Sequence, residues 1–243
     1  MTSAPLALGV ADVNWFTTAN LFRELDEPDV DLLTLRCMDY RNGWRKGLLP
    51  WSRSCRLRRT APGRWDRDVL LPPGWMKRYP RLGMKPIART LRRFWAKSGP
   101  GRLKGLLATY PHYLHLLDLA EPDVSLYYNL DDYALYWPGW ADRLAEIEHA
   151  LIRRAEATVC VSQVQADAFR NAVPEAASRI HHIPHGTPES FLAARPLDLP
   201  GPPPADVAAL PRPLLGYVGS LEDRLDWPLL DAVSRRFPRA SIV

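Results

Sequence analysis

Two adjacent acids are the clearest candidates for chemistry in this sequence. Asp131 and Asp132 follow an apolar run, Val124 to Leu130, that has the composition of a buried strand. In open parallel sheets, ligands bind beyond the carboxyl ends of the strands, where a carboxylate can orient a substrate hydroxyl or act as a base. The alternative is that one of these acids only caps the following turn. Adjacent acids lack the spaced Asp-x-Asp pattern of a nucleotide-sugar cation site, so no metal is predicted.

Histidines near two predicted strand ends suggest further ligand contacts. His112 follows an apolar segment and could bind a ligand or move protons, although histidines packed inside a protein are commoner. His185 and Gly186 end a short apolar strand, a place suited to touching a ligand held between domains. The neighbouring histidines on that strand would point to opposite faces, so they do not predict a metal cluster.

A phosphate-binding pattern occurs near the C-terminus. Gly219 and Ser220 follow the apolar run Pro213 to Val218 and precede a helical stretch from Asp226 to Phe237. Backbone N–H groups at such a junction, together with the helix N-terminus, attract phosphate, and glycine allows the close approach. A structural turn is the alternative, since the pattern alone is weak.

Strands and helices alternate in the part of the sequence that would position these residues. Helices are predicted from about Thr17 to Leu25 and from Asp142 to Glu156. Seven segments are strand candidates: Leu6–Val10, Val30–Leu35, Asp68–Leu71, Gly105–Thr109, Val124–Leu130, Thr158–Val161 and Ile180–Ile183. This order predicts an α/β fold with a parallel sheet.

A proline-rich stretch predicts the domain organisation. Seven prolines lie between residues 195 and 213, which excludes a helix there and predicts a semi-rigid linker at residues 195–212. We therefore expect a complete Rossmann-like domain at residues 1–194. Residues 213–243 would form the opening βαβ of a second, nucleotide-sugar-binding domain.

The charge is unevenly distributed along the chain. From Arg36 to Lys104 the sequence has 20 Lys or Arg and three acids, whereas the whole chain has a net charge of +5. Apolar side chains recur at helical spacing among these bases: Ile87, Leu91, Phe94 and Trp95. This is typical of a basic amphipathic helix at a membrane interface, and interleaved tryptophans favour that interpretation over a solvated helix face. We expect an anionic membrane surface as a partner, and no nucleic acid.

The composition favours a cytoplasmic protein that is peripheral on the inner face of the membrane. No run of eighteen apolar residues is present, and no basic segment precedes the first apolar run. The three cysteines lack the spacing of a zinc site, which indicates reduced thiols.

Several of these motifs together resemble glycosyltransferases of the GT-B fold, of the group 1 or family 4 type. The family pattern has an "AD-x-V-x-x-S" strand and an "IPNG" turn, where this chain has His185 in place of the common asparagine. The resemblance covers residues 124–243 well and the first hundred residues only in the order of elements. Three segments carry it: Glu148–Ser162, Arg179–Phe191 and Leu214–Val243.

The resemblance implies transfer of a sugar from a nucleotide-sugar donor to a cell-surface polysaccharide or lipid-linked acceptor. It implies retention of the anomeric configuration, with no metal and no cofactor besides the co-substrate. Asp131 or Asp132 would be catalytic, and Asn129 and His112 would bind the acceptor. The donor would contact five residues: Gly219, Ser220, Arg224, His185 and Gly186.

Two departures from the family pattern matter. Arg224 is the only cation in a loop where many relatives have two, and the sequence ends at Val243, before the paired glutamates that grip the donor. We therefore expect this chain to be inactive by itself. The alternative function is a non-catalytic protein that binds a membrane surface or polyanion and retains only the acceptor domain. No GxGxxG follows the first strand, which disfavours a dinucleotide enzyme.

Overall fold

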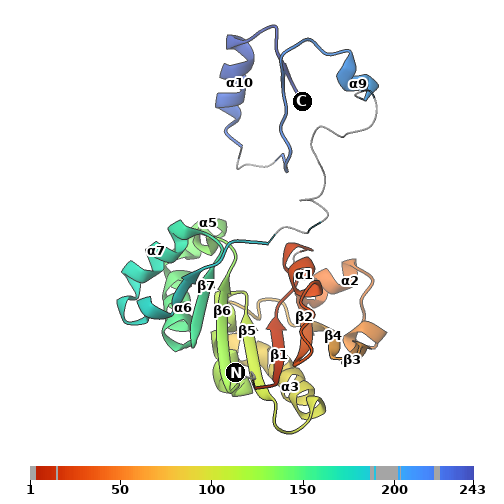
Figure 1. Ribbon diagram of the computed structural model, residues 1–243, viewed down its shortest axis with the longest axis vertical. Helices are drawn as coiled ribbons and strands as arrows, with labels where there is room; N and C mark the ends of the chain where they lie inside the picture. Colours follow the sequence, from red (N-terminus) through yellow and green to blue (C-terminus); the bar gives the residue numbers. More distant parts are fainter. Residues whose placement is uncertain (1–3, 15, 187–188, 190–201, 203, 222–224) are drawn as a thin grey trace. The chain divides into compact units, whose positions relative to one another are not determined.

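The computed structural model describes residues 4–14, 16–186, 189, 202, 204–221 and 225–243. The chain divides into two compact units, Met1–Gly186 and Thr187–Val243 (Figure 1). Each unit is described by itself.

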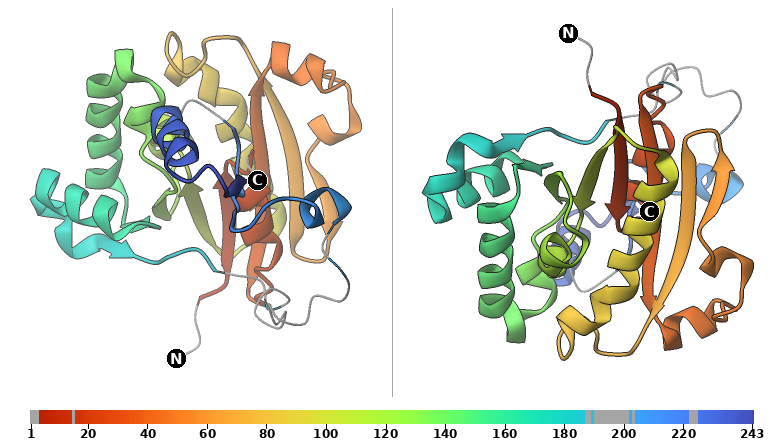
Figure 2. Two further views of the ribbon diagram at one scale, coloured as in Figure 1. Left: turned by 90° about the horizontal axis from the view of Figure 1, so that it is seen from above. Right: turned by 90° about the horizontal axis from the view of Figure 1, so that it is seen from below.

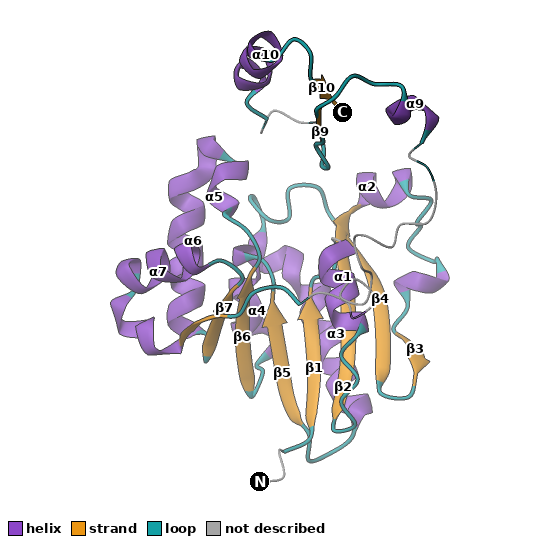
Figure 3. Ribbon diagram, turned by 45° about the horizontal axis from the view of Figure 1, so that its top comes forward, coloured by secondary structure: helices purple, strands orange, loops and turns teal. Residues whose placement is uncertain are grey.

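The described strands of the first unit form one sheet in the order β3-β4-β2-β1-β5-β6-β7-β8 (Figure 3). All neighbouring pairs are parallel except β3 and β4, which are antiparallel. The strands are β1 (Leu6–Ala11), β2 (Val30–Asp39), β3 (Arg58–Ala61), β4 (Arg64–Leu71), β5 (Leu103–Ala108), β6 (Val124–Asn129), β7 (Ala157–Cys160) and β8 (Ile180–His182).

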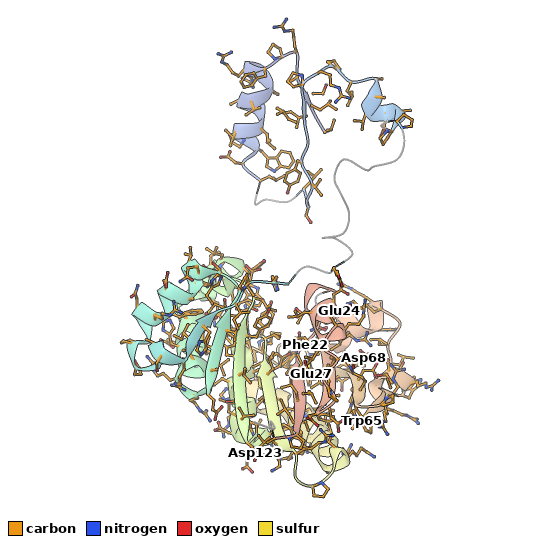
Figure 4. The ribbon with its side chains drawn as sticks, viewed as in Figure 1. Phe22, Glu24, Glu27, Trp65, Asp68 and Asp123 are labelled. Atoms are coloured by element: carbon orange, nitrogen blue, oxygen red, sulfur yellow. The ribbon has the colours of Figure 1, made fainter. Side chains whose placement is uncertain are left out.

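Helices cover the two faces of this sheet unequally. Buried side chains of α3, α4, α6 and α7 share one core with one face, whereas α1 packs Phe22 into a smaller core on the other face (Figures 2 and 4). The helices of the first unit are α1 (Phe16–Arg23), α2 (Tyr40–Arg45), α3 (Pro80–Ser98), α4 (Leu116–Ala120), α5 (Tyr133–Tyr136), α6 (Ala141–Arg154) and α7 (Gln163–Ala172). The 3₁₀ turns are η1 (Arg53–Cys55), η2 (Pro111–His115), η3 (Pro138–Trp140) and η4 (Pro174–Arg179).

The predicted α/β fold with a parallel sheet is confirmed, and each of the seven strand candidates overlaps an observed strand. The strand missed by sequence is β3, a four-residue edge strand with the sequence Arg-Arg-Thr-Ala. Arginine and threonine side chains can point into solvent from an edge strand, so no apolar alternation marks it.

The membrane role expected for the apolar stripe of α3 is wrong. Ile87, Leu91 and Phe94 are fully buried, and Trp95 is nearly so, with its indole N–H donating to the Ala7 carbonyl at 3.0 Å. The stripe therefore packs on the sheet, which is the usual partner of an amphipathic helix. No helix among the described residues is long and apolar enough to cross a membrane.

The second unit contains α9 (Ala205–Ala208), β9 (Leu214–Leu215), α10 (Trp227–Arg236) and β10 (Ser241–Ile242). β9 and β10 pair in parallel, and no residue of α10 is buried. The expectation of no helix within residues 195–212 is wrong at α9. The reason is that no proline lies between Pro204 and Pro211, which leaves one turn free to form.

A buried acid lies in the contact between α6 and the sheet. Glu148 is 5% exposed and accepts hydrogen bonds from the Tyr127 hydroxyl and, at 3.2 Å, from the Asn129 side-chain amide. Burial raises the pKa of Glu148 from 4.5 to about 7, while the hydrogen bonds act in the opposite direction. The folded chain therefore keeps a proton on Glu148 at pH values where the unfolded chain has lost it.

We expect Glu148→Gln to change the pH dependence of stability. Because the folded pKa is raised, the contribution of Glu148 to stability is full below pH 4.5 and is lost as the pH rises through about 7. Glutamine cannot ionise, so the variant lacks this loss of about 3 kcal/mol. Urea denaturation below and above this interval measures the difference. Unfolding free energies that change in parallel with pH in the two proteins would contradict it.

Candidate active site

Three neighbouring strands end at one edge of the sheet, the upper edge in Figure 3. β1, β5 and β6 lie side by side, with Ala11 paired to Ala108 and Ala108 paired to Tyr127. From β1 the chain continues to β2 on one side, and β5 lies on the other side. The order therefore reverses at β1, which is the position where open α/β sheets bind ligands.

The buried acid at this edge is Asp12, which the sequence pattern did not single out. Asp12 is 4% exposed, and its Oδ2 accepts hydrogen bonds from the Tyr113 hydroxyl at 2.6 Å and the Asn14 amide at 2.7 Å. Its backbone N–H donates to the Thr109 hydroxyl at 2.8 Å. The sequence signal was an acid directly after the first strand, because two of its partners, Thr109 and Tyr113, lie 97 and 101 residues away.

The environment of Asp12 suits an interaction with a substrate hydroxyl. Burial raises its pKa from 3.8 to about 6, although hydrogen bonds from Tyr113 and Asn14 lower it. Among the described residues, Oδ1 accepts only the Asn14 backbone N–H, at 3.2 Å. Since a carboxylate oxygen has two lone pairs, the described residues leave Oδ1 capacity for one more donor.

Asp131 and Asp132 lie on the segment after β6, as their position in the sequence suggested. Asp132 caps α5 by accepting from the Ala134 backbone N–H at 3.2 Å, which is the alternative role considered for one of the two. Asp131 is exposed and accepts from the Tyr136 hydroxyl at 2.6 Å. Asp131 is therefore the more accessible carboxylate.

Asn129 is the last residue of β6. It is fully buried, and its amide donates to the Asp131 carbonyl at 2.9 Å and to Glu148. These hydrogen bonds connect β6 with the segment that follows it. Asn129 therefore helps to hold the backbone of Asp131 in place. The predicted contact of Asn129 with the acceptor stays a prediction.

His112 lies in an aromatic cluster between η2 and α6. It is 2% exposed, stacks on Trp140 at 5.4 Å between ring centroids, and helps to line a 230 Å³ pocket with Lys77. Burial, and secondarily Lys77, lowers the pKa of His112 to about 4, so the ring is neutral at neutral pH. Neither ring nitrogen has a hydrogen-bond partner among the described residues. Its role towards an acceptor stays a prediction.

The remaining predicted residues are placed as follows. His185 and Gly186 are exposed after β8, with His185 Nδ1 3.4 Å from the Tyr128 hydroxyl. Gly219 and Ser220 follow β9 in the second unit and are exposed, whereas Arg224 lies outside the described residues. In the described part of the chain, no group of three or more His, Cys, Asp or Glu side chains could hold a metal ion.

By sequence, the chain matches no family profile and no curated protein. By structure, it is similar to the α,α-trehalose 6-phosphate synthase of Burkholderia multivorans, at 12% identity and a TM-score of 0.57. It is also similar to the UDP-forming α,α-trehalose-phosphate synthase of Burkholderia xenovorans, at 9% identity and a TM-score of 0.56. A third similar structure is UGT89C1 of Arabidopsis thaliana complexed with UDP, at 11% identity and a TM-score of 0.50.

These alignments take in 99% of this chain in all three comparisons. They span 64%, 63% and 66% of the three solved chains, in the order given above. The chain thus extends over about two thirds of the length of these structures. It has the α/β architecture of GT-B glycosyltransferases.

Proposed function

We propose that this chain belongs to a glycosyltransferase that moves a sugar from a nucleotide-sugar donor to a cell-surface polysaccharide or lipid-linked acceptor. The observation that carries the proposal is the fold, which follows that of GT-B enzymes over 99% of the chain. Two of the similar structures are described by their UDP chemistry, one as UDP-forming and one as complexed with UDP. A nucleotide diphosphate sugar is the donor class that this likeness favours.

In this proposal the two parts of the chain have different substrates. Residues 1–194 hold the acceptor, and residues 213–243 begin the donor domain, joined by the linker at 195–212. Backbone N–H groups at Gly219 and Ser220 would meet the donor phosphates, because glycine permits close approach and the helix that follows favours anions. Arg224, His185 and Gly186 would complete the donor contacts.

The acceptor hydroxyl would lie over the ends of β1, β5 and β6. Asp131 or Asp132 would orient it, and Asp12 would accept a hydrogen bond from it at Oδ1, which has one donor among the described residues. Such positioning lowers the barrier without covalent chemistry, and the developing phosphate charge would be stabilised by backbone amides and cations. The resemblance of the sequence motifs to family 4 enzymes supports retention of configuration without a metal. The enzyme would work at the cytoplasmic face of the membrane.

We expect one of Asp131→Asn and Asp132→Asn to lower sugar transfer by about 10² or more, without loss of stability. Asparagine keeps the shape and, at position 132, the helix cap, so the change isolates the charge. Turnover is measured with nucleotide-sugar donors in a protein that carries this chain with a complete donor domain.

The matched control is Asp123→Asn. Asp123 (labelled in Figure 4) directly precedes β6, whereas Asp131 follows it, and Asp123 accepts from the Lys104 backbone N–H at 2.8 Å. The turnover of the Asp123→Asn variant should equal that of wild type. Wild-type turnover in both site variants, with unchanged melting temperature, would refute the assignment and favour the non-catalytic binding protein.

A further inference from the structure

Two tryptophans are far more exposed than their size would suggest. Trp44 is 75% exposed and Trp51 is 71% exposed. Both lie on α2 or in the turn that follows it, among basic side chains. The Trp44–Trp51 surface is defined by six residues, all exposed: Arg41, Trp44, Arg45, Lys46, Trp51 and Arg53.

Local structure places both tryptophans on exposed segments. α2 is capped by Asp39, and its buried residue is Gly43, where a Cβ would come within 2.4 Å of the Leu70 side chain. The helix therefore lies against β4 on its glycine side, and the neighbouring Trp44 is left in solvent. Leu49 and Ser52 close a turn with bonds of 2.9 and 2.8 Å, and Trp51 lies within that turn.

The positive charge of this surface is not compensated locally. Residues 40–63 contain seven Lys or Arg and no acid, and the preceding acid, Asp39, accepts hydrogen bonds from Asn42 as the cap of α2. The acids of the adjacent strand β4 are already paired, Asp66 with Arg58 and Asp68 with Arg36, both at 2.5 Å. Within the described part of the chain, none of the four bases of the surface makes an ion pair.

We propose that the Trp44–Trp51 surface seats this chain on a bilayer that contains anionic phospholipids. Indole rings favour the headgroup level of a bilayer, where their apolar body is buried and their N–H stays hydrated. The bases would meet the lipid phosphates, each adding to the attraction. The binding element is thus α2 and its turn, and the buried stripe of α3 takes no part in it.

The tryptophans decide between a bilayer and a soluble polyanion. A polyanion needs only the bases, whereas two exposed indoles within eight residues gain free energy mainly by leaving water. The inference rests on the proposed function in one respect, which is that a membrane-bound acceptor would give the chain a reason to bind a bilayer. It is measured without any sugar transfer.

The test is flotation of the full chain with vesicles of phosphatidylcholine, alone or mixed with phosphatidylglycerol. Wild type should float with the mixed vesicles and lose this binding at high salt. Arg41→Ser with Arg45→Ser should weaken binding by roughly fivefold for each base removed. Trp44→Ser with Trp51→Ser should weaken it by roughly tenfold or more.

Two pairs of exposed residues serve as matched controls. Lys85→Ser with Arg89→Ser removes the same charge from α3, and Leu82→Ser with Val164→Ser removes exposed apolar side chains elsewhere. Both control pairs should bind the mixed vesicles within about twofold of wild type. This change in binding is smaller than the change expected from removing a single base of the surface. Melting temperatures show whether each variant is folded; if the double tryptophan variant melts early, Trp51→Ser alone replaces it.

Several results would overturn the inference. Equal recovery of wild type on both kinds of vesicle would exclude an anionic-lipid interaction. Tryptophan variants that bind as well as wild type would show simple polyanion binding. Control pairs that weaken binding as much as the surface variants would show diffuse charge. None of these results bears on transfer to a soluble acceptor, so this inference and the proposed function can fail separately.

Discussion

The carboxylate of Asp12 is almost entirely removed from solvent, so donors from neighbouring strand ends must satisfy it. Tyr113 and Asn14 bond its Oδ2, while Thr109 bonds its backbone. Thr109 in turn offers its carbonyl to the Tyr133 hydroxyl at 2.6 Å. This single network therefore connects the ends of β1, β5 and β6, and it fixes the edge of the sheet on which the candidate site depends.

A second buried carboxyl, that of Glu148, forms a hydrogen-bond network with the last residues of β6. Glu148 on α6 bonds Tyr127 and Asn129, and Asn129 bonds the backbone of Asp131. Asp131, the exposed acid, is therefore held in place by a buried hydrogen-bond network. Asp12 is itself a member of such a network. Both networks contain a carboxyl whose pKa is raised by burial. Their surroundings differ, because only Asp12 lies at the point where the strand order reverses.

The sequence predicted the fold better than the site. Strand-helix alternation was sufficient for the parallel sheet, because apolar runs and their spacing are local properties. Asp12 was missed because its partners Thr109 and Tyr113 are 97 and 101 residues away. The stripe around Leu91 was correctly predicted as a helix face, but periodicity cannot tell a sheet from a membrane as its partner. Exposure of Trp44 likewise follows from packing at Gly43, which only the structure shows.

The measurement that tests this account most directly compares two buried carboxyls in a protein with a complete donor domain. Asp12→Asn and Glu148→Gln each neutralise one, and turnover with a nucleotide sugar and urea stability are measured together. The account predicts that Asp12→Asn lowers turnover by about 10² or more, whereas Glu148→Gln keeps turnover within about threefold. Wild-type turnover in Asp12→Asn, or equal losses that follow stability in both variants, would contradict it.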